Sequence, residues 1–201
     1  MTNMKLIPLF PLDVVILPSE EFYLHIFEPR YKQLILEAKE EGISFGIPFV
    51  KNGEIQDFGT VVKLKTIFST YPDGELDISV VGTGIFKVNE PLSIIEDKLY
   101  SGAVVYIFNE TSSPQDYLLK LRPLLMEYLQ LKKGEPVKLN SNRPESSFHA
   151  AALLNFAPEV KYKLITFHSE QERLIWLINE LKVLLQARKM EIQLDQDFYL
   201  N

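Results

Sequence analysis

The chain has 201 residues, of which 46% are hydrophobic and 24% are charged, a balance typical of a globular protein with a sizeable core. It contains no cysteine, which excludes a disulfide framework and a cysteine-based metal site and fits a reducing cytoplasm. The net charge of −6 is uneven, because residues 1–110 hold nine Lys and Arg against 16 Asp and Glu. This acidic half would repel a phosphate backbone, so we expect no nucleic-acid binding.

The N-terminal segment, residues 1–18, is apolar but does not match a signal peptide. Pro8, Pro11, Pro18 and Asp13 interrupt it, and Lys5 is its one basic residue. No run of about 18 apolar residues occurs in the sequence, which argues against a membrane span. We therefore expect a cytoplasmic protein that does not cross a membrane.

Residues 1–110 are predicted to be rich in β-structure, because short apolar stretches alternate with turn signals over about six strands. The clearest hairpin has its turn at residues 72–74, Pro-Asp-Gly, followed by strict apolar alternation over 76–80. Gly82 and Gly84 predict a tight turn with positive φ between two strands. They do not form a phosphate loop, because neither a third glycine nor a helix follows.

One helix is expected inside this half, from Pro29 to Glu41. Proline is favoured in a first helical turn, where its missing N–H has no partner to lose. Gly42 suits the left-handed position just after a helix end. The sequence therefore predicts a strand followed directly by a short amphipathic helix.

The start of this helix allows two interpretations, which concern His25, Glu28, Pro29 and Arg30. In a catalytic interpretation, Glu28 and His25 would act as acid and base and Arg30 would hold an anion. In a structural interpretation, Glu28 places negative charge at the helix N-terminus, Arg30 pairs with a carboxylate or a carbonyl, and Phe27 packs inward. We favour the structural interpretation, because no nucleophile stands nearby in the sequence.

After a polar linker at residues 109–116 the chain is predicted to be helical. Residues 116–133 show the spacing of one helix face, with a kink or a helix start at Pro123. A short buried helix is expected next, ended by Pro158. Residues 160–168 are ambiguous between helix and strand, and helix is favoured.

The last helix is the strongest in the sequence. Ser169 is its expected cap, and Glu172 completes a capping box. We expect two domains, a β-rich domain over 1–110 and a helical bundle over 111–201 that packs on it.

Motifs for catalysis and metal binding are missing from the sequence. Three histidines, His25, His149 and His168, do not have the spacing of a zinc site. Neither a nucleotide-binding P-loop nor a nucleophile elbow occurs. We expect no catalytic residue, no metal and no cofactor.

Two blocks of sequence carry a resemblance to a known family. They are IPLFPLDVVILP at residues 7–18 and LHIFEPRYKQLI at residues 24–35, followed by FGIPF and the Pro-Asp-Gly hairpin. In this order they resemble the N-terminal substrate-binding domain of Lon proteases. The resemblance implies an α+β fold, with a small bent sheet or PUA-like pseudo-barrel followed by a helical bundle. Ser19 departs from the family pattern, which usually has glycine after this proline.

The resemblance implies the recognition part of a Lon protease in a stand-alone form, without ATPase and peptidase modules. We expect a non-enzymatic module that binds unfolded or apolar polypeptides, with an adaptor role for an ATP-dependent protease or a chaperone. Aromatic residues expected in loops are the peptide-binding candidates: Phe22, Tyr23, Phe68 and Tyr71. The alternatives are an RNA-binding PUA-like protein and an enzyme with an unrecognised site.

Overall fold

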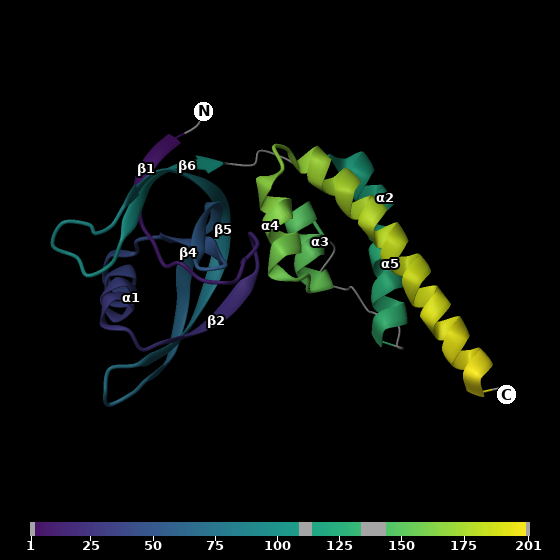
Figure 1. Ribbon diagram of the computed structural model, residues 1–201, viewed down its shortest axis with the longest axis horizontal. Helices are drawn as coiled ribbons and strands as arrows, with labels where there is room; N and C mark the ends of the chain where they lie inside the picture. Colours follow the sequence, from purple (N-terminus) through teal and green to yellow (C-terminus); the bar gives the residue numbers. More distant parts are fainter. Residues whose placement is uncertain (1–2, 109–113, 134–143, 200–201) are drawn as a thin grey trace. The chain divides into compact units, whose positions relative to one another are not determined.

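The computed structural model describes residues 3–108, 114–133 and 144–199, and these residues form six strands and five helices (Figure 1). The fold class is α+β, as expected from the sequence. The elements run in the order β1 (Asn3–Pro8), β2 (Glu21–Ile26), α1 (Pro29–Glu41), β3 (Phe45–Lys51), β4 (Glu54–Thr70), β5 (Leu76–Leu92), β6 (Gly102–Phe108), α2 (Gln115–Lys133), α3 (Ser147–Leu154), α4 (Pro158–Thr166) and α5 (Glu170–Tyr199).

The strands form one antiparallel sheet in the order β1-β6-β5-β4-β3. β5 is long enough to serve two neighbours on the same side, since its second half pairs with β6 and its first half pairs with β2. Isolated bridges also connect Leu9 to Gly46 and Leu12 to Phe49, so the segment after β1 runs beside β3. The result is the bent sheet that the sequence predicts.

The turn predicted at Gly82 and Gly84 is wrong, because both residues lie within β5, where the pairing with β4 only shifts its register between them. Their φ angles are not in the left-handed region. Glycine is needed at position 82 for another reason, because a Cβ there would lie 2.3 Å from the backbone oxygen of Leu17. The chain crosses β5 closely at this point, where the Ser19 amide donates to the Gly82 carbonyl and the Gly82 amide donates to the Glu20 carbonyl. This crossing sets the position at which β2 begins.

Helix α1 has the predicted bounds and covers one face of the sheet (Figure 1). Gly42 ends it in the left-handed conformation, with φ 69°. Its buried residues are Tyr31, Leu34, Ile35 and Ala38, which belong to the same core as Ile26, Leu76, Ile78 and Val80. This apolar contact supplies the main core behind β2 and β5.

The chain divides into two compact units: Met1–Glu110 with Phe156–Thr166, and Thr111–Asn155 with Phe167–Asn201. Helix α4 therefore belongs to the unit that contains the sheet. The docking of a helical bundle on the β-rich part stays a prediction.

Lys161 and Tyr162 of helix α4 contact other residues of the first unit. The Lys161 ammonium lies 2.5 Å from the Glu20 carboxylate, and the Lys161 side chain is only 9% exposed. The Tyr162 ring packs on Phe49 at 5.3 Å between centroids, and its hydroxyl accepts a hydrogen bond from the Phe58 amide at 3.4 Å. These contacts fix α4 to strands β3 and β4.

The predicted role of Pro158 is wrong, because this proline begins α4 and does not end the preceding helix. Helix α3 ends at Asn155, which adopts a left-handed conformation with φ 52°. Asparagine tolerates this conformation better than most residues, so it can replace glycine as a helix-ending residue. Residues 160–168, ambiguous in the sequence, lie mostly in α4.

The second unit is built from α2, α3 and α5, and α2 and α5 lie side by side (Figure 1). Helix α2 is a single helix that contains Pro123. The Ser169 hydroxyl accepts a hydrogen bond from the Glu172 amide at 3.2 Å, which confirms the predicted cap of α5. Two rows of leucines form the buried seam: Leu118, Leu121, Leu125 and Leu129 on α2, and Leu174, Leu177, Leu181 and Leu185 on α5. Over the described residues, no helix is long and apolar enough to span a membrane.

Candidate functional site

Strand β2 has one buried and one exposed side, because side chains alternate along a strand. Phe22 and Leu24 pack against the core shared with α1. Tyr23 points the other way and is 66% exposed. Phe27 was expected to pack inward, which is wrong, since it is 59% exposed and continues the outer side of the strand. Phe22 and Tyr23 therefore differ in environment, and neither lies in a loop as predicted.

The exposed side of β2 carries a group of rings that the β4–β5 hairpin extends. Tyr23 stacks on Phe68 with 5.6 Å between centroids. His25 stacks on Phe27 at 6.3 Å and meets the edge of Tyr71 at 6.0 Å. We call these five residues, Tyr23, His25, Phe27, Phe68 and Tyr71, the aromatic row. Neighbouring apolar groups exposed in this way are typical of interaction surfaces.

Two carboxylates hold the histidine of the aromatic row. The Nδ1 atom of His25 lies 2.8 Å from Asp77 Oδ1, and its Nε2 atom lies 2.9 Å from Glu75 Oε2. The Tyr71 hydroxyl donates to the other oxygen of Asp77 at 2.6 Å. The hydrogen bond to Asp77 is the main cause that raises the pKa of His25. The hydrogen bond from Tyr71 is the main cause that lowers the pKa of Asp77. When the imidazole is protonated, both ring nitrogens of His25 can donate to these carboxylates.

The raised pKa of His25 predicts a stability that depends on pH. Because the folded-state pKa exceeds the unfolded value near 6.5, the contribution is complete below that value and is lost as pH rises through the folded-state pKa. We expect the free energy of unfolding to fall more between about pH 5.5 and about pH 8.5 in the wild type than in His25→Gln. Urea denaturation at several pH values measures this difference. Parallel profiles for the two proteins would contradict the prediction.

The residues of the helix start divide into two groups. Glu28 and Arg30 pair with each other, with the Arg30 Nη2 atom 2.6 Å from the carboxylate, and Glu28 makes no side-chain cap to α1. Arg30 also lies over the Tyr31 ring, 4.6 Å from its centroid. Pro29 occupies the first turn of α1. His25 stands apart from them in the aromatic row, so the acid–base pair of the catalytic interpretation is not assembled in this structure.

Glu75 and Asp77, which orient His25 and Tyr71, are not among the site residues predicted from the sequence. Phe27 was not predicted to be exposed. The position of Phe27 in the run from Glu21 to Phe27 could have revealed it, because alternate residues of a strand share a face and Phe27 falls on the side of Glu21, Tyr23 and His25. No comparable signal exists for Glu75 and Asp77, since their contact with His25 depends on the pairing of β2 with β5.

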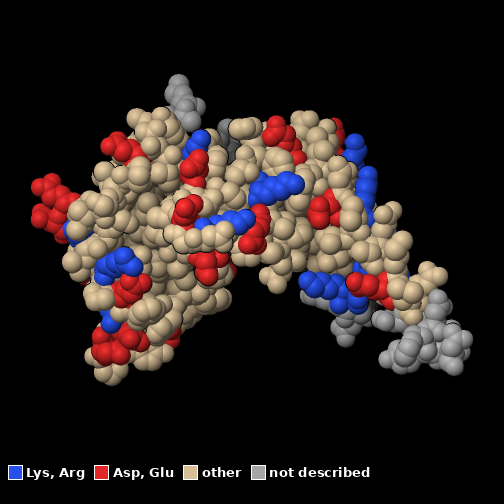
Figure 2. Space-filling model, viewed as in Figure 1, with Lys and Arg blue, Asp and Glu red and all other residues tan. Residues whose placement is uncertain are grey.

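The exposed rings of the aromatic row are suited to contact with another molecule. No group of side chains that could hold a metal ion occurs within the described residues. On the face shown in Figure 2, acidic and basic side chains are interspersed and neither sign forms a continuous stripe. Exposed rings surrounded by polar side chains can contact apolar side chains of another polypeptide, while the surrounding polar side chains stay hydrated.

Comparison with known proteins identifies the family. The family model of the ATP-dependent protease La (LON) substrate-binding domain matches residues 6–183. Similar solved structures include a Lon N-terminal domain protein from Xanthomonas campestris, with a TM-score of 0.64, 22% identity, and coverage of 87% of this chain and 98% of that one. The N-terminal domain of a Lon protease from the Mycobacterium avium complex gives a TM-score of 0.69 at 17% identity, covering 89% of this chain and 98% of that one. These two likenesses show the fold, and the match over residues 6–183 shows that the chain belongs to the Lon substrate-binding domain family.

Proposed function

We propose that this chain is a non-enzymatic binding module that recognises unfolded or apolar polypeptide segments through the aromatic row. The observation that carries the proposal is the exposure of Tyr23 (66%), Phe68 (56%) and Phe27 (59%) on one side of β2 and its neighbouring hairpin. Membership of a substrate-binding family supports a polypeptide as the ligand. Of the four candidates from the sequence, Tyr23, Phe68 and Tyr71 belong to this surface.

The absence of an enzymatic role is part of the proposal. The matching family model describes a substrate-binding domain and not a protease or ATPase module. We further propose that the protein delivers its ligands to an ATP-dependent protease or a chaperone in the cytoplasm, without binding nucleic acid or membranes. The acidic balance of residues 1–110 supports the exclusion of nucleic acid.

Alanine substitutions in the aromatic row test the proposal. Tyr23→Ala and Phe68→Ala are each expected to weaken binding of a fluorescently labelled unfolded protein by roughly thirtyfold, since truncating an aromatic anchor typically costs about 2 kcal/mol. Fluorescence anisotropy measures the affinity. Ile94→Ala is the matched control, because Ile94 is also strongly exposed, at 61%, but lies outside the row.

The control is expected to bind like the wild type. Equal affinities for the wild type, the two row variants and the control would refute the role of the aromatic row. The circular dichroism spectra of all variants should match, because both rings lie on the surface and their removal opens no cavity in the core.

A further inference from the structure

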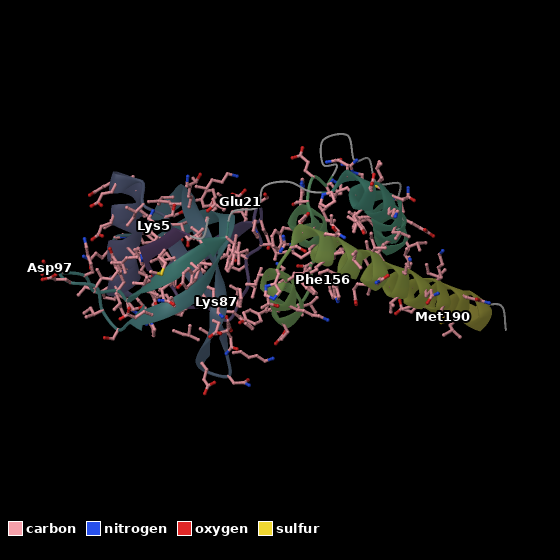
Figure 3. All side chains as sticks on the ribbon, turned by 90° about the horizontal axis from the view of Figure 1, so that it is seen from above. Lys5, Glu21, Lys87, Asp97, Phe156 and Met190 are labelled. Carbon is pink, nitrogen blue, oxygen red and sulfur yellow. The ribbon has the colours of Figure 1, made fainter. Side chains whose placement is uncertain are left out.

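Strand β2 is an edge strand. Its six residues pair with β5 in continuous register, and β5 is its one strand partner among the described elements. The strand begins at Glu21, which is labelled in Figure 3. Natural edge strands are usually protected by bulges, prolines or lysines, and the segment Glu21–Ile26 has none of these. Its outer edge is therefore open to pairing with another strand.

The pattern of hydrogen bonds shows which backbone groups face this edge. The Gly82 amide donates to the Glu20 carbonyl, so the Glu20–Gly82 pair faces inward. In an antiparallel ladder such pairs alternate, and therefore Phe22, Leu24 and Ile26 direct their N–H and C=O groups toward β5. The backbone groups of the residues between them, Tyr23 and His25, point outward.

The outward backbone groups of Tyr23 and His25 make no hydrogen bond within the described part of the chain. Both side chains belong to the aromatic row. The same two residues thus offer backbone donors and acceptors at the edge and rings on the adjoining face.

We propose that the ligand of this protein binds as an added antiparallel strand on the outer edge of β2. The proposal rests on the proposed function and specifies its ligand as an extended segment with apolar residues at every second position. The antiparallel direction follows the sheet, in which every strand pair is antiparallel. Backbone hydrogen bonds would supply affinity without sequence dependence, and the aromatic row would select the apolar residues.

The geometry links the two parts of this recognition. In an antiparallel pair, residues directly opposite each other place their side chains on the same face. A ligand residue that bonds to the backbone of Tyr23 or His25 would therefore project its own side chain over the aromatic row. The apolar ligand residues are also the ones whose N–H groups face β2, while the polar residues between them direct their N–H groups to solvent.

Peptides with methylated backbone nitrogens test this arrangement. The probe is a fluorescent peptide of about seven residues, close to the length of β2, in which valine and threonine alternate. One version carries N-methyl groups on two valines, and the control version carries them on two threonines. We expect methylation of the valines to weaken binding about tenfold or more, because it removes the donors that face β2, and methylation of the threonines to change the affinity less than about twofold.

The outcomes separate this inference from the proposed function. Equal binding of both methylated versions and the parent would overturn strand addition and leave recognition by the aromatic row intact. The same conclusion follows if an unfolded protein binds in a Tyr23-dependent way while the parent peptide does not bind. Failure of both the peptide and the unfolded protein to bind would overturn the proposed function as well.

Discussion

Replacement of Glu170 by alanine is expected to destabilise the helical unit by about 3–5 kcal/mol, because it breaks a buried ion pair and removes only one partner. The Glu170 carboxylate accepts hydrogen bonds from the Ser147 amide at 2.7 Å and from the Ser147 hydroxyl at 2.5 Å. Arg173 Nε donates to the same carboxylate at 3.1 Å. The side chains of Glu170 and Arg173 are only 6% and 4% exposed.

The large cost follows from the charge that remains. Burial lowers the pKa of Arg173 to about 10, because desolvation disfavours the charged guanidinium. Without Glu170 the guanidinium would lose the carboxylate to which its Nε donates, and the start of α3 would lose the acceptor for its Ser147 amide. Helices α3 and α5 would lose the hydrogen bonds between Ser147 and Glu170 that connect them.

A second ion pair on α5 provides the control. Glu191 and Arg188 have the same spacing of three residues, but their side chains are 61% and 38% exposed. Glu191→Ala should cost less than about 1 kcal/mol, because water screens exposed pairs. Urea denaturation followed by the fluorescence of Trp176, the single tryptophan, measures both variants. Similar unfolding midpoints for Glu170→Ala and Glu191→Ala would contradict the prediction.

Replacement of Gly82 by alanine is expected to destabilise the sheet-containing unit by about 1–3 kcal/mol or more, because the added methyl group meets backbone atoms. The new Cβ would lie 2.3 Å from the oxygen and 2.9 Å from the carbon of the Leu17 carbonyl. Backbone cannot rotate away as a side chain can. The crossing segment must therefore shift, and with it the hydrogen bonds that Gly82 shares with Ser19 and Glu20.

Gly84 offers a control on the same strand. A Cβ at Gly84 would find its nearest neighbour, the Phe108 oxygen, at 3.9 Å, which is ordinary contact. Gly84→Ala should therefore leave stability within about 0.5 kcal/mol of the wild type. Thermal and urea denaturation followed by circular dichroism compare the two variants. A loss at Gly84 as large as that at Gly82 would contradict the close crossing as the cause of the loss at Gly82.

Helix ends that depend on the conformational preferences of single residues were predictable from the sequence. Pro29 and Gly42 gave the bounds of α1, because proline and glycine each fit one end of a helix. Ser19 is a residue at which the local chemistry of the sequence does not match the backbone conformation. It has φ 71°, a left-handed conformation that costs a non-glycine residue about 1 kcal/mol or more, at the position where the family usually has glycine.

Features that depend on distant contacts were not predictable from the sequence. Gly82 resembles a turn residue, and only the position of Leu17 across the fold reveals why glycine is required there. The contact of His25 with Glu75 and Asp77 requires the register of β2 against β5, about 50 residues further along the chain. Exposed rings such as Phe27 can be found from alternation once the preceding residues are assigned to a strand.

The membership of α4 in the first unit has a consequence for the order of events during synthesis. A ribosome completes all six strands before it makes residues 111–155, and it adds α4 only afterwards. Until Lys161 emerges, Glu20 lacks its cationic partner, and Tyr162 has not yet covered Phe49. The nascent sheet must therefore wait for a helix made some 50 residues later, although domains generally fold in the order in which they are made. Translation speed across residues 111–155 thus sets how long the incomplete unit stands exposed to other chains.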